Sequence, residues 1–273
     1  MIRLALRVRR EDAEVALAEL LELAPGGVEE VDRGDVVEYA VYGAPGELPA
    51  LPDLRAAAGG ALVEVVTTEI EDDWGERWRA FHRPVEVGGR LRVRPPWEPA
   101  AEGFQEIVID PAQAFGTGAH HTTRLCLELL LELEPAGALV DVGCGSGVLA
   151  IAAARLGFAP VSGIDHERES VAATLANAAA NGVSVDAARH DLLRDGAVRG
   201  APTVLANLLR PLLLRIARDG FAGGERPCTL IAGGLLADEA DEVAAAFAQA
   251  LGLRERERRH GGEWAALLLE RAG

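Results

Sequence analysis

The sequence predicts an α/β protein in which a doubly wound, mostly parallel seven-stranded sheet follows a small α+β domain. From about residue 104 onward, short apolar runs that predict strands alternate with segments of helical periodicity. Residues 1–70 show a different order, in which strands outnumber helices two to one. The 273 residues suffice for two modest domains. We expect a small domain over 1–70, a joint over 71–100 and the larger domain over 101–273.

The small domain begins with a segment in which apolar and charged residues alternate, as in a half-buried strand. A helical pattern follows and stops at Pro25-Gly26-Gly27, and Arg33-Gly34-Asp35 predicts a hairpin turn. In chain order we expect strand 3–9, helix 11–23, strands 28–31 and 36–41, helix 51–58 and strand 62–70. This βαββαβ order is ferredoxin-like. It suits a binding module as well as a structural appendage.

The joint contains three of the four tryptophans of the chain. Trp74, Trp78 and Phe81 fall at helical spacing, and Trp97 follows Pro95-Pro96. An aromatic stripe of this kind is more typical of a packed helix than of a ligand site. We therefore predict a linker helix and an inter-domain joint.

The larger domain alternates strands with helices and ends differently, in a hairpin around Gly261-Gly262. The predicted strands are 138–142, 161–164, 185–189, 203–207 and 229–232, followed by the hairpin strands 251–259 and 264–269. This pattern is typical of a doubly wound sheet, whose ligands bind at the carboxyl ends of the strands.

Composition excludes several classes of function. The net charge of −16 repels polyanions, so we expect no binding to nucleic acid. No apolar stretch reaches the roughly 20 residues of a membrane helix, and the start lacks a secretion signal, which favours the cytoplasm and no membrane association. The cysteines Cys126, Cys144 and Cys228 form no CxxC pair, so neither zinc nor a disulfide framework is expected. Cys144 is not predicted to be a nucleophile.

A glycine loop marks the predicted ligand site. An apolar strand over 139–142 leads into Gly143-Cys144-Gly145-Ser146-Gly147 and then into a helix. Glycine permits positive φ and lets a ligand approach the backbone. The spacing is GxGxG, whereas a dinucleotide site requires GxGxxG. S-adenosylmethionine needs no phosphate cradle, and Asp141 would suit its ammonium group.

Acidic residues at two further strand ends fit a nucleoside ligand. Asp165 ends the second predicted strand, where a carboxylate can accept hydrogen bonds from both ribose hydroxyls. Asp191 follows the third strand, where an adenine contact is expected, and Leu192 could pack on the ring. The loop and Asp165 together are a stronger signal than either alone.

Three further segments carry a resemblance. Residues 110–123 contain the run DPxxAFGTGxHxTT, and Ala206-Asn207-Leu208-Leu209 and Ala232-Gly233-Gly234-Leu235-Leu236 end the fourth and fifth strands. Together they resemble the PrmA-type methyltransferases of the large-subunit ribosomal protein L11. The resemblance implies a Rossmann-like class I fold and S-adenosylmethionine as cofactor. It also implies a small domain that recognises L11, and methylation of lysine side chains and the terminal α-amine.

The resemblance also implies roles for individual residues. The matching cofactor contacts are Thr123, Gly143, Asp165 and Asn207. We add Gly145 and Thr117 as cofactor contacts, and expect residues 115–123 to close over the cofactor. The side-chain oxygen of Asn207 is our candidate for holding the substrate amine.

Several alternatives remain open at this stage. Thr122 and Thr123 could cap a helix over 124–133, Asn207 could bond its own backbone, and His120 could be a packed loop histidine. The chain could methylate another protein or small-molecule amine, or be a non-catalytic nucleoside-binding module. A dinucleotide oxidoreductase is disfavoured by the loop spacing.

Overall fold

The computed structural model describes residues 2–13, 16, 29–43, 62–69, 82–111, 120–223 and 226–271. The chain divides into two compact units, Met1–Phe81 and His82–Gly273. Each unit has its own hydrophobic core.

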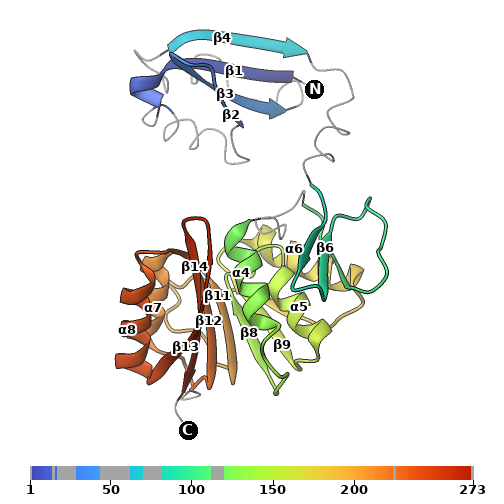
Figure 1. Ribbon diagram of the computed structural model, residues 1–273, viewed down its shortest axis with the longest axis vertical. Helices are drawn as coiled ribbons and strands as arrows, with labels where there is room; N and C mark the ends of the chain where they lie inside the picture. The colour runs from blue at the N-terminus through green and yellow to red at the C-terminus, as the bar shows by residue number, and fades with distance from the viewer. Residues whose placement is uncertain are drawn as a thin grey trace. The chain divides into compact units, whose positions relative to one another are not determined.

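The first unit contains a four-stranded antiparallel sheet in the order β2-β3-β1-β4 (Figure 1). Its elements are β1 (Ile2–Arg9), the short 3-10 helix η1 (Arg10–Asp12), β2 (Glu29–Asp32), β3 (Val36–Gly43) and β4 (Leu62–Glu69). This is the strand order of a ferredoxin-like βαββαβ fold. Of the two predicted helices, 11–23 and 51–58, only residues 11–13 and 16 are among the described residues. The ferredoxin-like assignment therefore stays a prediction.

The two faces of this sheet differ because side chains alternate along each strand. One face is apolar and packs Leu6, for example, into the core of the unit. On the other face, the buried carboxylate of Glu38 accepts hydrogen bonds from Arg7 Nε at 2.7 Å, Arg3 Nη2 at 2.8 Å and Arg33 Nη2 at 2.9 Å. These bonds, led by those of Arg33 and opposed by burial, lower the pKa of Glu38 to about 2. The carboxylate is therefore ionised throughout the physiological range.

The second unit contains the predicted seven-stranded sheet, in the order β10-β9-β8-β11-β12-β14-β13 (Figure 1). Its strands are β8 (Leu139–Val142), β9 (Val161–Asp165), β10 (Asp186–Arg189), β11 (Thr203–Asn207), β12 (Thr229–Leu236), β13 (Leu253–Gly261) and β14 (Trp264–Arg271). The first five are parallel, and β14 runs antiparallel to both of its neighbours. The chain reverses its direction of travel across the sheet after β10, so a switch point lies between β8 and β11.

Helices cover both faces of this sheet (Figure 1). On one face lie α4 (His121–Leu130), α5 (Val148–Leu156) and α6 (Arg168–Ala180), and on the other lie α7 (Arg210–Asp219) and α8 (Ala240–Leu251). Successive residues of β11 feed the two cores: Leu205 packs with α4 and α5, and Val204 with α7 and α8. The doubly wound prediction is confirmed.

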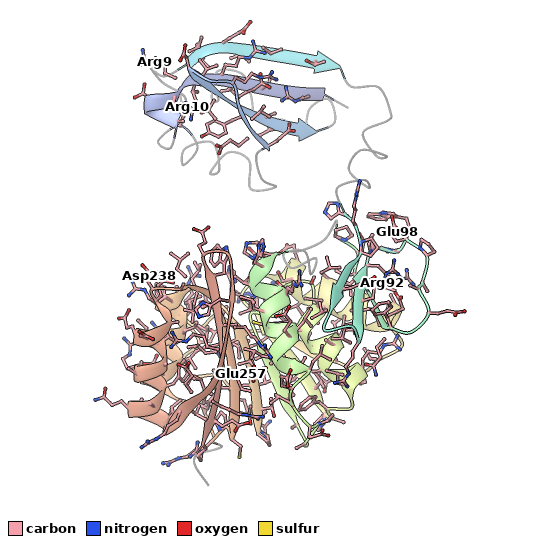
Figure 2. All side chains as sticks on the ribbon, viewed as in Figure 1. Arg9, Arg10, Arg92, Glu98, Asp238 and Glu257 are labelled. Carbon is pink, nitrogen blue, oxygen red and sulfur yellow. The ribbon has the colours of Figure 1, made fainter. Side chains whose placement is uncertain are left out.

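Residues 82–111 belong to the second unit. They form a three-stranded sheet of β5 (Val85–Val87), β6 (Leu91–Arg94) and β7 (Gln105–Val108), with β6 parallel to β7. Buried residues of these strands join the core beneath α4 and α5. Arg92 on β6 (Figure 2) donates to Glu106 Oε1 at 3.2 Å and to the Pro99 carbonyl at 2.8 Å. Trp74, Trp78 and Phe81, on which the linker-helix prediction rests, lie outside the described residues.

Candidate active site

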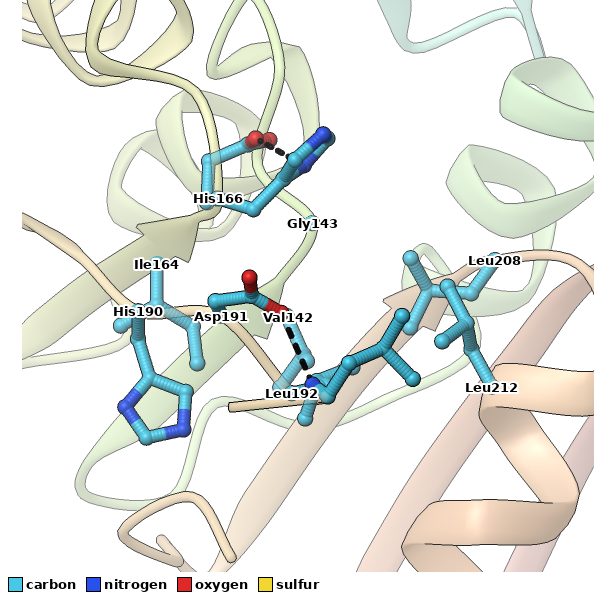
Figure 3. Close-up of a pocket in the computed structure, with 11 residues that line it drawn as sticks. Val142, Gly143, Ile164, His166, His190, Asp191, Leu192, Leu208 and Leu212 are labelled. Atoms are coloured by element: carbon cyan, nitrogen blue, oxygen red, sulfur yellow. Dashed lines mark hydrogen bonds and ion pairs between the residues drawn. The ribbon is translucent and has the colours of Figure 1, made fainter. Parts of the chain in front are cut away.

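The carboxyl ends of four neighbouring parallel strands, β10, β9, β8 and β11, meet at one edge of the large sheet. They bring together the glycine loop and the residues that follow each strand. These segments line a pocket that encloses about 560 Å³ of empty space, part of it open to solvent (Figure 3). Ligands of doubly wound folds bind in this position.

The glycine loop forms a tight turn at the end of β8. The backbone N–H groups of Gly143 and Cys144 both donate to the Ile164 carbonyl, at 2.8 and 3.0 Å. Gly143 has φ +81°, and a Cβ there would lie 2.5 Å from Leu208 Cδ2. Glycine is therefore favoured by the positive φ, and a larger residue would also have to displace the end of the Leu208 side chain. Its bare backbone forms part of the pocket wall.

Asp165 is held in place by three groups. Its Oδ2 accepts from the Gly145 N–H at 3.0 Å, and its Oδ1 accepts from the Glu167 N–H at 3.0 Å. His166 Nδ1 lies 3.2 Å from Oδ1 (Figure 3). A carboxylate offers about four lone-pair positions, so Asp165 can accept from one further hydroxyl as it stands, and from two when the exposed His166 side chain turns away. It lines the pocket while remaining only 8% exposed.

Asp191 also lines the pocket, on the loop after β10 (Figure 3). Its Oδ1 accepts from the Leu193 N–H at 2.8 Å, and Oδ2 lies 3.5 Å from Arg194 Nε. The carboxylate thus shapes its own turn. Its adenine contact stays a prediction.

The rest of the pocket is largely apolar. The five apolar lining residues named in Figure 3 are Val142, Ile164, Leu192, Leu208 and Leu212. Sequence reasoning had identified only Leu192 as a pocket residue. Val142, Ile164 and Leu208 lie at or directly beyond strand ends, which was the available signal, whereas Leu212 lies in the first turn of α7.

Asp141 lies behind the loop and is 1% exposed. Its Oδ2 accepts from the Ala150 N–H of α5 at 3.2 Å, and its Oδ1 has no hydrogen-bond partner among the described residues. Burial, opposed by the hydrogen bond from Ala150 and assisted by the nearby charge of Asp165, raises the pKa of Asp141 to about 7. A cation near Asp141 would favour its ionised form.

Asn207 and Thr123 come together although they are 84 positions apart in the chain. Asn207 Nδ2 donates to Thr123 Oγ1 at 3.4 Å, while Asn207 Oδ1 is buried with no partner in the part of the chain that the structure describes. A Cβ on Gly233 would lie 3.0 Å from this oxygen. The end of β11 therefore holds a buried acceptor that requires a donor, although neither Asn207 nor Thr123 is among the residues that line the pocket.

His120 has a structural role. It is the N-cap of α4, where its Nδ1 accepts from the Thr122 N–H at 3.4 Å. Its ring packs edge-on against Trp264, with the ring centroids 5.2 Å apart. The packed-histidine interpretation is confirmed. The capping alternative for Thr122 and Thr123 is wrong, because α4 begins at His121 and both threonines lie inside its first turn.

Two further residues considered in the sequence analysis are Cys144 and Thr117. Burial raises the pKa of the Cys144 thiol to about 12, so the neutral thiol is no nucleophile, as predicted. Thr117 lies outside the described residues. Among the residues that are described, no cluster of three or more His, Cys, Asp or Glu could hold a metal, and no helix is long and apolar enough to cross a membrane.

The sheet order, with its glycine loop and acidic strand end, defines a class I methyltransferase fold. Residues 53–272 match the family described as ribosomal protein L11 methyltransferase (PrmA). The chain belongs to this family, and the resemblance seen in the sequence is confirmed.

Individual relatives agree with this assignment. A protein named ribosomal protein L11 methyltransferase from Geobacter sulfurreducens is 37% identical over 258 residues, which cover 90% of this chain and 85% of that protein. One of the same name from Caldanaerobacter subterraneus subsp. tengcongensis is 36% identical, covering 79% and 70%. A solved structure, the ribosomal protein L11 methylase from Lactobacillus delbrueckii subsp. bulgaricus, has a TM-score of 0.60 and 26% identity. It covers 70% of this chain and 100% of that one.

Proposed function

We propose that the chain transfers methyl groups from S-adenosylmethionine to amines of ribosomal protein L11, namely lysine side chains and the terminal α-amine. The observation that carries this proposal is the buried Asn207 Oδ1, an acceptor without a described partner beside the glycine loop. An amine N–H is a donor that can satisfy this oxygen. Membership of the L11 methyltransferase family supports the same substrate.

The residues present fit S-adenosylmethionine, which supplies an activated methyl on a cationic sulfonium. Asp165 has acceptor capacity for the ribose hydroxyls, and the bare backbone of Gly143 and Gly145 can border the amino-acid end. The apolar wall beside Asp191 suits a flat adenine ring. Asp141 suits the ammonium group, while Thr117 and Thr123 complete the proposed cofactor contacts.

Methyl transfer requires a neutral amine in line with the methyl group. A lysine amine has a reference pKa of about 10.4 and must lose its proton first. An apolar pocket next to a positive charge lowers that pKa, so the proton can pass to solvent water without a dedicated general base. Asn207 Oδ1 would accept one amine N–H and direct the lone pair, because transfer depends on alignment. Thr123 would keep the Asn207 amide turned so that its oxygen faces the amine.

Residues 1–70, within the first unit, are the proposed recognition domain for L11. The net charge of −16 supports attraction of a basic protein and the expectation that free nucleic acid does not bind. A ribosomal substrate supports a cytoplasmic location for the proposed reaction.

The proposal is tested by incubating purified L11 with labelled S-adenosylmethionine and the full chain. The matched control is L11 whose amines have been acetylated, because an acetylated nitrogen cannot accept a methyl group while the rest of the protein is unchanged. We expect label in L11 and none in the acetylated protein. Label in both would overturn amine methylation. Label in neither, with cofactor bound, would favour another amine substrate or a non-catalytic nucleoside-binding module.

A further inference from the structure

Helix α6 carries a buried polar stripe that the methyl-transfer mechanism does not use. Thr174, Asn177 and Asn181 fall at i, i+3 and i+7, so they share one face of the helix. They are 0%, 4% and 5% exposed. Burying polar groups is costly unless they are hydrogen-bonded, so the partners of this stripe reveal its role.

Two residues of the stripe bond the carbonyls of the glycine loop. Thr174 Oγ1 donates to the Gly145 carbonyl at 3.0 Å, and Asn177 Nδ2 donates to the Ser146 carbonyl at 2.9 Å. Both carbonyls are therefore turned toward α6. The Gly145 N–H donates instead to Asp165 Oδ2. The stripe therefore fixes the peptide planes of the loop, and none of its three residues lines the pocket.

Asn177 makes a second connection that Thr174 does not make. Its Oδ1 accepts from the Asp110 N–H at 3.1 Å. Asp110 begins the 110–123 run that carries part of the family resemblance. One buried amide thus joins the glycine loop to the first residue of that run.

Asn181 provides a natural comparison on the same helix face. Its Oδ1 accepts from the Val108 N–H at 2.8 Å, and its Nδ2 donates to the Val108 carbonyl at 2.7 Å. Nδ2 also reaches the Asn177 carbonyl at 2.7 Å. Asn181 therefore anchors β7 to α6, and its side-chain bonds to Val108 and Asn177 leave the glycine loop untouched.

We propose that Asn177 is a positioning residue for the cofactor: it holds the Ser146 carbonyl and the Asp110 N–H in one arrangement, and so sets the shape of the glycine loop. The inference rests on the proposed cofactor site. It predicts that cofactor affinity depends on Asn177 far more than on Asn181, although the two amides are equally buried.

The test compares Asn177→Asp with Asn181→Asp in the full chain. Each change keeps shape and acceptors but removes the Nδ2 donor. Binding of S-adenosylhomocysteine is measured by calorimetry, with thermal unfolding measured in parallel. We expect both variants to lose stability, but only Asn177→Asp to weaken binding, by tenfold or more. The KM for S-adenosylmethionine should rise in the same proportion, with the KM for L11 unchanged.

Thr174→Val covers the case in which Asn177→Asp does not fold. It removes the hydroxyl bond to the Gly145 carbonyl and should weaken binding several-fold at near-normal stability. The inference would be overturned if a folded Asn177→Asp or Thr174→Val variant bound S-adenosylhomocysteine as tightly as the original chain. It would also be overturned if Asn177→Asp and Asn181→Asp lost the same amount of affinity. If the original chain itself fails to bind S-adenosylhomocysteine, the proposed function fails instead.

Discussion

Replacing Asp165 by alanine should separate cofactor binding from folding. In the structure its carboxylate bonds the N–H groups of Gly145 and Glu167 and keeps acceptor capacity on the pocket side. Hydrogen bonds to a charged group contribute about 1.5–3 kcal/mol each. Loss of two ribose bonds, at the lower end of that range, therefore weakens binding by about 3 kcal/mol, or roughly 100-fold.

The same change also affects stability, because two backbone N–H groups lose their acceptor. Water can reach part of this site, so we expect a loss of about 1–2 kcal/mol rather than unfolding. The assay is calorimetric titration with S-adenosylhomocysteine, alongside thermal denaturation without ligand. Asp165→Asn keeps one oxygen, so its affinity for S-adenosylhomocysteine should fall between those of the alanine variant and the original chain. Affinity of Asp165→Ala within threefold of the original would refute the cofactor assignment.

Three further predictions concern other parts of the molecule. Asn207→Ala should lower turnover by about tenfold, the equivalent of one hydrogen bond, and affect cofactor affinity less; an unaltered rate would remove Asn207 from the mechanism. Asp141 has its pKa raised from 3.8 to about 7, so its contribution to stability is full below the unfolded value and is lost as pH rises through 7. Urea unfolding of the free protein from about pH 5 to pH 7 should therefore show a decline of roughly 2 kcal/mol that Asp141→Asn lacks, and parallel pH profiles would contradict this. Deleting Met1–Phe81 should abolish methylation of L11 but leave S-adenosylhomocysteine binding intact, because the second unit has its own cores; L11 methylation at the original rate would exclude a recognition role.

The fold of the second unit was predictable because its strands are short apolar runs that end in informative residues. The strand 203–207 has the bounds of β11, and Asp165 ends β9 as expected. β12 runs to Leu236, beyond its predicted end at 232. Its pairing with β14 continues past an irregularity between Ala232 and Leu235, which a local pattern containing Gly-Gly does not reveal.

The polar contacts of the site were harder to predict from sequence. Histidine is not among the preferred N-cap residues, so the start of α4 at His121 was missed. Asn177 lies on an alanine-rich helix, and its partner Asp110 is 67 positions away. Periodicity identifies which face of a helix is apolar, but it does not identify which backbone group a buried amide will meet.

The central claim is tested most directly by intact-protein mass spectrometry of L11 after incubation with the chain and S-adenosylmethionine. The 273 residues contain no lysine, so methylation of the chain's own side-chain amines cannot compete for the donor. The account predicts that the mass of L11 rises in whole methyl steps, with peptide fragments locating them on lysines or the terminal amine. An unchanged L11 mass, in a sample where the chain binds S-adenosylhomocysteine, would contradict it.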